Sequence, residues 1–527
     1  MKYFLISIIP LFLYIILDTI KGLHMLQQNW YNLGGRYVKW LNNNSKKIFL
    51  SYDYLYIFIF LLSLVLKNNI LMYIVFFYYL IITIILNNEQ KKEIVKKPLD
   101  FTSRIKRLVF TIFVLYFITI LFICINYNEE LLSIYYLILG TLVYLNYYVI
   151  LLANIINIPI EKLVYLYYKT KALNKLRKME QMEVIGITGS YGKTSTKNAL
   201  NEILNEKYIS FKTPKNFNTN YGLIRTINEY IDKYNNYFVA ELGAFKKGDI
   251  KSRCKLVKPK YGILTKIGEA HLESFKSKEN IIKGKFELIE SLPSNGVAVL
   301  NKDDINQVNY KLNNKCKVLW YAIKNKDADI YADNIKYSSK GMEFDVHINN
   351  RKETFKTKLL GEANIYNILA SITLANYLGL NMEELKRGVF KIRPVEHRLE
   401  LKSYGRINYI DDAYNSNPEG SKMAVEVLGL MPGKKIVITP GMIELGPKQY
   451  EYNYNFGTYI SKVADLTILV GSEQTKPIQD GLLDSKYDKN KLIVLNDVKE
   501  AINIAQNYFR EEVYILLEND LPDMFNE

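Results

Sequence analysis

Five long apolar stretches follow one another in the first third of the sequence, and this series constrains the fold more than any other feature. They are residues 3–17, 55–66, 70–86, 108–125 and 131–156. A helix that crosses a bilayer core needs about 20 apolar residues, and fewer where aromatic and lysine side chains extend its ends. One such stretch could be a buried core helix, but a tandem series indicates a polytopic membrane region.

The first two stretches are the weakest candidates for membrane spans. Residues 3–17 end at Asp18, and residues 55–66 are long enough to cross only if Tyr52, Tyr54 and Lys67 act as interfacial anchors. A cleavable signal peptide does not fit the first stretch, because Lys2 is the only basic residue before it and no small-x-small cleavage site follows it. We therefore expect a membrane region with about five helices over residues 1–178.

The charge of the chain points to a membrane surface. The 69 Lys and Arg against 53 Asp and Glu give a net charge of +16, which suggests either nucleic acid or an anionic bilayer as a partner. Residues 1–178 hold 20 Lys and Arg against eight Asp and Glu, so the remainder is close to neutral. The excess belongs to the membrane region, and we expect contact with membrane lipids and none with nucleic acid.

Loop charge predicts the orientation of these helices. Residues 21–50 and 87–107 carry five and seven Lys or Arg, whereas the connection after residue 125 carries Glu129 and Glu130 and no cation. Cytoplasmic loops are the ones enriched in Lys and Arg. Five spans with the N-terminus outside satisfy this rule, and they place the chain after residue 180 in the cytoplasm of a multi-pass plasma-membrane protein.

Length and cysteine content limit the remaining possibilities. A chain of 527 residues is expected to form several domains. Its three cysteines, Cys124, Cys254 and Cys316, are scattered and odd in number, which excludes a disulfide scaffold and a zinc site made of cysteines alone. A reducing, cytoplasmic setting is the simplest interpretation for the part of the chain outside the membrane.

From residue 184 onward, short apolar runs alternate with helical patterns, which favours an α/β structure with a mainly parallel sheet. Residues 184–188 are predicted to form a buried strand and residues 197–205 a helix. The turn between them contains Gly189, Ser190, Tyr191, Gly192, Lys193, Thr194 and Ser195. Strand, glycine turn and helix in this order form a cradle for phosphates, where Lys193 supplies charge and Thr194 or Ser195 can reach Mg²⁺.

The spacing of this turn differs from the strict Walker pattern, which would have glycine at position 187, where Ile187 stands. The turn resembles instead the nucleotide loop of the Mur ligase family, the ATP-dependent amide-forming enzymes of cell-wall peptide assembly. Six further stretches match family motifs in family order: residues 216–222, 241–244, 266–273, 364–367, 411–418 and 441–446. The last two are most similar to the branch that adds D-alanyl-D-alanine to a muramoyl tripeptide.

The resemblance covers about residues 182–527 and implies a fold. After the α-helical transmembrane region, residues 179–392 would form a central ATP-binding domain on a P-loop ATPase-type parallel sheet. Residues 393–527 would form a C-terminal Rossmann-like α/β domain. The implied activity is that of an ADP-forming ligase, in which ATP converts a carboxylate to an acyl phosphate and an amine then displaces phosphate. Such phosphoryl transfer depends on cationic groups and metal ions.

The resemblance also implies roles for individual residues. Candidate catalytic residues are Lys193, Lys285 and His271. Candidate ligands of Mg²⁺, with two ions expected, are Thr194, Glu241, His271 and Lys285 carbamylated by CO₂. ATP would contact residues 189–195 together with Asn364, Asn367, Arg398 and Asp412. The substrate side would hold Asn218, Thr219 and Asn220. Lys283 is a nearby competitor of Lys285, and Ala363 stands where the family usually has a histidine before Asn364.

The sequence departs from the family at both ends. Membrane helices stand in place of the family's soluble domain, which holds the uridine-diphosphate sugar. An acidic segment, residues 517–523, replaces a Lys-Gly-Ser-Arg-like segment of the family. We therefore expect a cell-wall precursor, either soluble or lipid-linked, to be joined to an amino acid or dipeptide. A poly-γ-glutamate-type capsule ligase is an alternative. An ATP-driven transporter or sensor is a third possibility, but apart from Asp18 and Asp53 the spans carry almost no charge.

Overall fold

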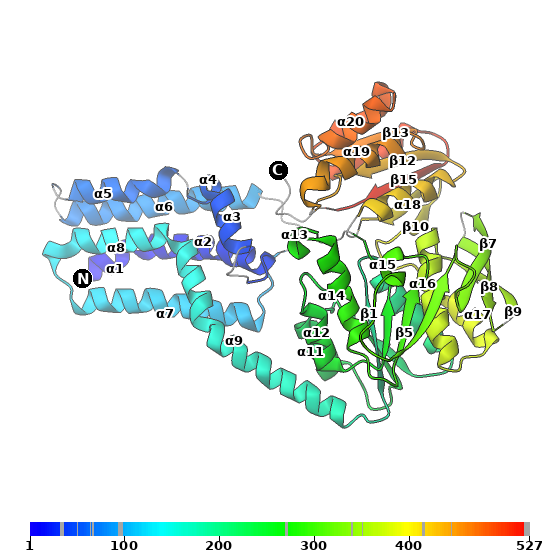
Figure 1. Ribbon diagram of the computed structural model, residues 1–527. Helices are drawn as coiled ribbons and strands as arrows, with labels where there is room; N and C mark the ends of the chain where they lie inside the picture. The colour runs from blue at the N-terminus through cyan, green and yellow to red at the C-terminus, as the bar shows by residue number, and fades with distance from the viewer. Residues whose placement is uncertain are drawn as a thin grey trace. The chain divides into compact units, whose positions relative to one another are not determined.

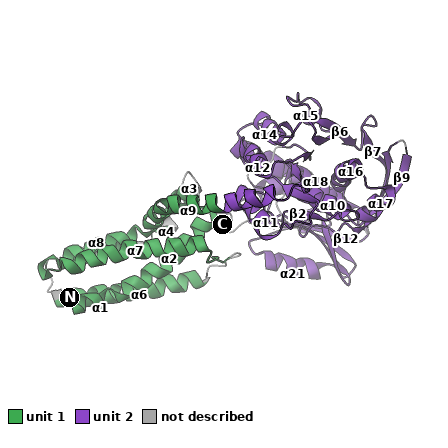
Figure 2. Cartoon of the chain, turned by 90° about the horizontal axis from the view of Figure 1, so that it is seen from below, with its two compact units in different colours: residues 1–167 green, residues 168–527 purple. Residues whose placement is uncertain are grey.

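The structure is a computed structural model that describes residues 1–31, 36–49, 51–63, 65, 68–92, 98–268, 272–338, 341–349, 351–413, 417–443 and 445–520. The chain divides into two compact units, Met1–Tyr167 and Tyr168–Glu527, which Figure 2 shows in two colours. The described part of the first unit is helical, whereas the second combines helices with two β-sheets (Figure 1).

The helices of the first unit are α1 (Lys2–Ser7), α2 (Ile9–Gln28), α3 (Arg36–Asn43), α4 (Ser45–Ile48), α5 (Leu55–Ser63), α6 (Asn68–Lys92), α7 (Ser103–Ile125), α8 (Leu132–Tyr144) and α9 (Asn146–Arg177). Helix α9 continues into the second unit. Within the described residues, four helical segments are long and apolar enough to cross a membrane. They are Lys2–Gln28, Asn69–Lys91, Ser103–Ile125 and Asn146–Arg177.

Two of the predicted spans differ in form from the observed helices. Helix α5 covers only nine residues of the predicted stretch 55–66. The predicted stretch 131–156 is shared by α8 and the start of α9, which are separated at Leu145. The number of spans and their orientation stay predictions.

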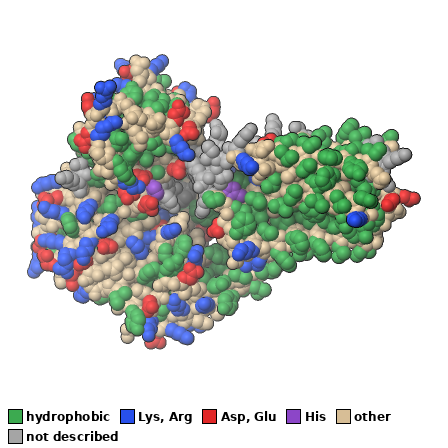
Figure 3. Space-filling view, turned by 180° about the vertical axis from the view of Figure 1, so that it is seen from behind, with side chains coloured by type: hydrophobic (Ala, Val, Ile, Leu, Met, Phe, Trp, Pro, Cys, Tyr) green, Lys and Arg blue, Asp and Glu red, His purple; other side chains and the backbone are tan. Residues whose placement is uncertain are grey.

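The first unit is apolar outside and polar at points inside. Phe110, Phe113 and Phe117 expose 67%, 62% and 52% of their surface on α7, and hydrophobic side chains cover most of this unit in Figure 3. Inside, the fully buried Asn146 donates from Nδ2 to Asp18 Oδ2 (2.8 Å), and its Oδ1 accepts from the Tyr116 hydroxyl (3.0 Å). Polar groups that join helices within an apolar exterior are typical of membrane bundles.

The first sheet of the second unit has nine strands in the order β2-β3-β1-β4-β5-β6-β7-β8-β9. Its strands are β1 (Glu183–Thr188), β2 (Ser210–Lys212), β3 (Tyr237–Glu241), β4 (Tyr261–Leu264), β5 (Val297–Asn301), β6 (Lys317–Ala322), β7 (Ile330–Ser338), β8 (Gly341–Ile348) and β9 (Arg351–Thr357). Strands β2 to β7 pair in parallel, as the alternating sequence pattern predicts, whereas β7, β8 and β9 add an antiparallel extension that the sequence analysis did not predict.

The helices of this part are α10 (Lys193–Leu204), α11 (Asn220–Glu229), α12 (Asp249–Val257), α13 (Leu272–Phe275), α14 (Lys278–Glu290), α15 (Ile305–Val308), α16 (Glu362–Tyr377) and α17 (Met382–Lys391). Leucine and isoleucine side chains of α10 and α16 pack with strand residues in one large core. Helix α14 packs on strands β1 and β4 and against α12. Helices therefore pack on the parallel part of the sheet, whereas β7 and β9 keep several exposed residues.

The second sheet has six strands in the order β10-β11-β15-β12-β13-β14, antiparallel only between β10 and β11. Its strands are β10 (Glu400–Tyr404), β11 (Ile407–Asp412), β12 (Lys434–Thr439), β13 (Leu466–Val470), β14 (Leu492–Leu495) and β15 (Val513–Glu518). Its helices are α18 (Pro418–Gly429), α19 (Gln449–Ile460), α20 (Lys476–Asp484) and α21 (Val498–Tyr508). The predicted boundary at residues 392 and 393 falls between α17 and β10 and stays a prediction.

Candidate nucleotide and metal site

The glycine loop joins the end of β1 to the start of α10. Gly192 has φ 81° and caps the helix, so α10 begins at Lys193, four residues before the predicted start. A Cβ atom on Gly189 would lie 1.9 Å from Thr265 Oγ1, and one on Gly192 would lie 2.4 Å from Asn367 Oδ1. Both positions therefore need glycine, one for close packing and the other also for its left-handed backbone.

The loop is held by groups on neighbouring elements. The Thr265 hydroxyl, just after β4, donates to the Tyr191 carbonyl at 2.6 Å. The Ser190 amide donates to the Lys266 carbonyl at 2.9 Å, and the Ser190 hydroxyl donates to the Gly268 carbonyl at 2.8 Å. These bonds fix the shape of the turn, while the amides at the start of α10 remain at a helix N-terminus, a position that favours anions.

Lys193 folds back over this loop. Its ammonium donates to the Gly189 carbonyl at 2.8 Å and to the Ser190 carbonyl at 2.9 Å. Burial lowers the pKa of Lys193 to about 8, with Arg398 adding to the effect and Glu241 opposing it. The charge of Arg398, a residue of the predicted C-terminal domain, therefore acts on Lys193 of the glycine loop.

Glu241, the last residue of β3, collects polar groups from α10 and from the loop before α11. Its Oε2 lies 3.0 Å from Lys197 Nζ and accepts from the Thr194 hydroxyl at 3.1 Å, while Oε1 accepts from Asn218 Nδ2 at 3.2 Å. The Glu241 and Lys197 side chains are 3% and 2% exposed. Burial would raise the pKa of Glu241, but Lys197 and Lys193 outweigh burial and hold it below the usual value. Glu241 is therefore an ionised carboxylate beside the loop.

Lys197 is the member of this cluster that the sequence analysis missed. It stands one helical turn after Lys193 on α10 and also donates to the Lys215 carbonyl at 2.8 Å. The signal was available, because residues four apart on a helix share a face. A second lysine on the face of the phosphate loop could therefore have been assigned to the site.

Lys285 lies inside the protein and Lys283 lies at its surface, although both belong to α14. Burial lowers the pKa of Lys285 well below the usual value, and the charges of Lys193 and Arg253 lower it further, against Asp249 and Glu287. The described residues give its ammonium no hydrogen bond or ion pair, and it lies 5.3 Å from the centroid of the Phe275 ring. A buried amine in cationic surroundings favours its neutral form.

The other predicted metal ligand, His271, lies outside the described residues, together with Glu269 and Ala270. Within the described ranges, no group of three or more His, Cys, Asp or Glu side chains could hold a metal ion. Among the four predicted ligands, Glu241 is the only carboxylate. The hydroxyl of a second predicted ligand, Thr194, donates to it.

The predicted adenine-side amides reach the loop from α16. The Thr196 hydroxyl of α10 donates to Asn367 Oδ1 at 3.1 Å, and Asn367 Nδ2 donates to Asn364 Oδ1 at 3.2 Å. Asn364 Nδ2 in turn donates to the Leu360 carbonyl at 2.8 Å. The two asparagines thus form one chain of hydrogen bonds that starts beside Gly192.

Asp412 ends β11, directly opposite Glu518 on the parallel strand β15. Its Oδ1 accepts from the Leu399 amide at 3.1 Å. Burial raises the pKa of Asp412 to about 6, although the Leu399 amide and Arg398 oppose this shift. Arg398 thus affects both Asp412 and Lys193, which links the two predicted nucleotide contacts of the C-terminal segment to the loop.

The predicted substrate residues have separate roles. Asn218 points its amide at Glu241, and its carbonyl accepts from Arg253 Nε at 2.9 Å. The Thr219 hydroxyl caps α11 by accepting from the Gly222 amide at 3.3 Å. Asn220 Nδ2 donates to the Ser252 hydroxyl at 2.9 Å. Only Asn218 of the three contacts the Glu241 cluster.

Comparison with known proteins supports the family suggested by the motifs. Residues 187–375 match the Mur ligase middle domain, and residues 397–517 match the domain described as "Mur ligase, glutamate ligase domain". The glycine loop and all but the last residue of the second sheet fall within these matches.

Two relatives and one crystal structure illustrate the likeness. A UDP-N-acetylmuramoyl-tripeptide--D-alanyl-D-alanine ligase of Buchnera aphidicola subsp. Baizongia pistaciae is 33% identical over 55% of this chain and 63% of its own length. The enzyme of that name from Buchnera aphidicola subsp. Acyrthosiphon pisum is 32% identical over 58% of this chain and 69% of its own. The MurF ligase of Thermotoga maritima in complex with ADP has a TM-score of 0.60 at 26% identity, covering 68% of this chain and 80% of that one.

The chain spans a little under two thirds of the length of the first of these relatives. The matched part includes the glycine loop, Glu241, the two asparagines of α16 and the strand that ends at Asp412. On these similarities in sequence and fold, the chain belongs to the Mur ligase family.

Proposed function

We propose that this protein is an ATP-dependent, ADP-forming ligase of cell-wall precursor synthesis. It would join the carboxylate of a muramoyl peptide precursor to the amine of an amino acid or dipeptide, with D-alanyl-D-alanine as the expected amine. The observation that carries the proposal is the buried Glu241 cluster beside a glycine loop, built from Thr194, Lys197 and Asn218. The names of the similar ligases support the choice of amine.

In the proposed reaction, a substrate carboxylate oxygen attacks the γ-phosphorus of ATP, and the bond to the β-phosphate oxygen breaks to release ADP. The amine then attacks the carbonyl carbon of the acyl phosphate, loses a proton and expels inorganic phosphate. Amides at the start of α10 and the Lys193 ammonium would hold the phosphates. Arg398 would neutralise the moving phosphoryl group, for which its charged planar fork is suited.

Mg²⁺ would be held by Thr194, Glu241, His271 and carbamylated Lys285, and would neutralise charge on the transferred phosphoryl group. The described residues fit this role in one respect. Glu241 is ionised and buried, and its present partners are a hydroxyl, an amide and the Lys197 ammonium. The negative charge of Glu241, which now pairs with Lys197, would also attract a bound cation.

The environment of Lys285 supports the proposed carbamate. The neutral amine is the form that attacks CO₂, giving a carbamate anion and a proton. Burial and the neighbouring cations Lys193 and Arg253 favour the neutral amine before the reaction. The same cations would stabilise the anion after it. The exposed Lys283 has neither advantage.

For the nucleoside, we propose that Asn364 and Asn367 lie on the adenine side and that Asp412 accepts hydrogen bonds from the ribose. Asp412 Oδ1 already accepts from the Leu399 amide, and carboxylate oxygens suit the hydroxyls of a ribose. On the substrate side, Asn218 would face the reacting carboxylate, while Thr219 and Asn220 would shape the start of α11.

We further propose that about five helices of the first unit, the four long apolar segments among them, anchor the ligase at the plasma membrane, with residues after 180 in the cytoplasm. The apolar exterior of the first unit supports this placement. A lipid-linked precursor would then meet the enzyme in two dimensions, which raises its effective concentration.

The first test is product analysis with the full-length protein in detergent. With ATP, Mg²⁺, a muramoyl tripeptide acceptor and D-alanyl-D-alanine, mass spectrometry should detect one new amide and equal amounts of ADP. Glutamate replaces the dipeptide in a parallel reaction, which tests the capsule-ligase alternative. ATP cleavage without an amide from any pair, unchanged by Lys193→Met, would contradict the proposal.

The pH dependence of ATP binding tests Lys193. The charged ammonium is present below its pKa of about 8, so ATP affinity should be steady near pH 7 and fall as pH rises through that value. Lys193→Arg keeps its charge in this range and should remove this decline. Affinities measured by calorimetry from pH 6.5 to 9.5 decide the question, and a decline that is the same in both proteins would exclude Lys193 as its source.

Lys285 and Lys283 form a matched pair for the carbamate. Lys285→Ala should lower turnover by about 100-fold or more, because it removes charge stabilisation at the reacting phosphate. Lys283→Ala should leave turnover nearly unchanged. With ¹³C-bicarbonate, a carbamate carbon signal should appear in the unmodified protein and in Lys283→Ala and vanish in Lys285→Ala. A signal retained in Lys285→Ala would place the carbamate elsewhere.

Cysteine labelling tests the membrane orientation. In a background with Cys124, Cys254 and Cys316 changed to serine, Glu130→Cys should react with an impermeant maleimide added to intact cells. Lys91→Cys should react only after the cells are opened, because its loop is predicted to be cytoplasmic. The reverse pattern would invert the predicted topology.

A further inference from the structure

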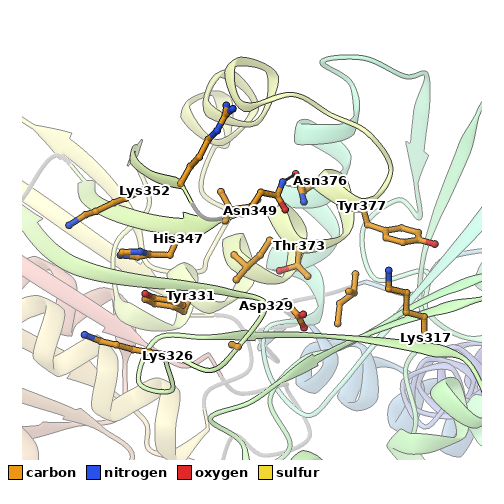
Figure 4. A pocket seen from close by; sticks show the side chains of 15 residues that line it. Lys317, Lys326, Asp329, Tyr331, His347, Asn349, Lys352, Thr373, Asn376 and Tyr377 are labelled. Atoms are coloured by element: carbon orange, nitrogen blue, oxygen red, sulfur yellow. Dashed lines mark hydrogen bonds between the residues drawn. The ribbon is translucent and has the colours of Figure 1, made fainter.

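A cavity of about 680 Å³ lies on the second unit, away from the glycine loop. It forms because β7 pairs only with the end of β6, through Tyr321 with Ile330 and Ala322 with Tyr331. The first residues of β6 therefore have no partner on β7. Its walls come from β6, β7, β8, β9 and the last turn of α16 (Figure 4). The antiparallel extension of the sheet therefore creates a hollow at the amino ends of the parallel strands.

This cavity is distinct from the candidate nucleotide site. The glycine loop follows the carboxyl end of β1, whereas the cavity lies by the first residues of β6 and β7. Helix α16 runs between the two places, with Asn367 near the loop and Asn376 at the cavity. Nine residues of helix separate these asparagines, which corresponds to about 14 Å along the axis.

The lining of the cavity is rich in cations, including Lys317, Lys326, Arg351 and Lys352. Lys352 is neutralised, because it lies 3.0 Å from Asp345 and 3.8 Å from Asp333. In the described part of the chain, no carboxylate lies at ion-pair distance from the other three, and Lys317 lies 4.9 Å from the Tyr377 ring centroid. The lining carboxylate, Asp329, accepts from the Trp320 amide at 2.7 Å.

A flat aromatic wall stands among these charges. The Tyr331 and His347 rings are stacked with centroids 4.3 Å apart and planes at 8°. In the view of Figure 4, Lys326 and Lys352 lie on either side of this pair, and Lys317 lies across the cavity beside Tyr377. Cations suit phosphate oxygens, with arginine able to bind two at once, and a stacked ring offers a face to a planar group.

We propose that this cavity binds a small organic phosphate, whose phosphate oxygens contact Lys317, Lys326 and Arg351 and whose planar part rests on the Tyr331 and His347 rings. The binding is non-covalent and does not depend on ligase activity. It adds a second anion site to a domain whose first anion site is the glycine loop.

Calorimetry with inorganic pyrophosphate and with uridine 5′-monophosphate tests the proposal. Full-length protein carrying Lys193→Met, which weakens anion binding at the loop, serves as the parent. The double variant Lys326→Gln/Arg351→Gln should bind both probes at least about tenfold more weakly than the parent, because charged hydrogen bonds are lost. The control Lys462→Gln/Lys489→Gln removes two exposed charges elsewhere and should bind as the parent does.

Equal affinities in the two double variants would overturn the proposal, whether both match the parent or both are weaker. Tyr331→Ala then separates an organic ligand from free phosphate. It should weaken binding of the uridine nucleotide severalfold and leave pyrophosphate binding unchanged. An unchanged affinity for the nucleotide would overturn the assignment of the ring pair, and the double variant still tests the cationic part if Tyr331→Ala fails to fold.

Discussion

The buried ion pair between Lys197 and Glu241 fixes the arrangement on which the candidate site depends. Its two side chains are almost fully enclosed, so removing either one would leave an unpaired charge in the interior, at a cost of about 3–5 kcal/mol. The pair ties the end of β3 to the first turns of α10, and Thr194 and Asn218 complete the bonds of the carboxylate. The strand edge and the glycine loop are therefore held at one distance.

Two regions of the protein use polarity in opposite ways. In the second unit, apolar side chains fill the space between sheet and helices, and charged groups gather at strand ends. In the first unit, apolar side chains face outward, while Asn146, Asp18 and Tyr116 meet inside. One chain thus contains one part with an apolar interior and another with an apolar exterior.

Much of this architecture could be predicted from the sequence, because strand, glycine turn and helix are local patterns. The alternating pattern gave the parallel strands, and the motif order gave the family. The antiparallel extension from β7 to β9 escaped because its strands are amphipathic and interrupted, with a register shift between Asp333 and Lys336. Lys197 escaped because the helix was predicted to begin at residue 197, so Lys193 and Lys197 were not placed on one helical face. Its role depends on Glu241, 44 positions later and on a neighbouring strand.

The hold of Lys193 on two carbonyls of its own loop has a thermodynamic consequence. If the proposed ATP binds here, its phosphates would displace those hydrogen bonds, so binding would be an exchange of partners and would yield less heat than the count of new contacts suggests. The turn itself is already clamped by Thr265, and little backbone freedom is left to lose. Nucleotide capture would then draw much of its driving force from released water and counterions.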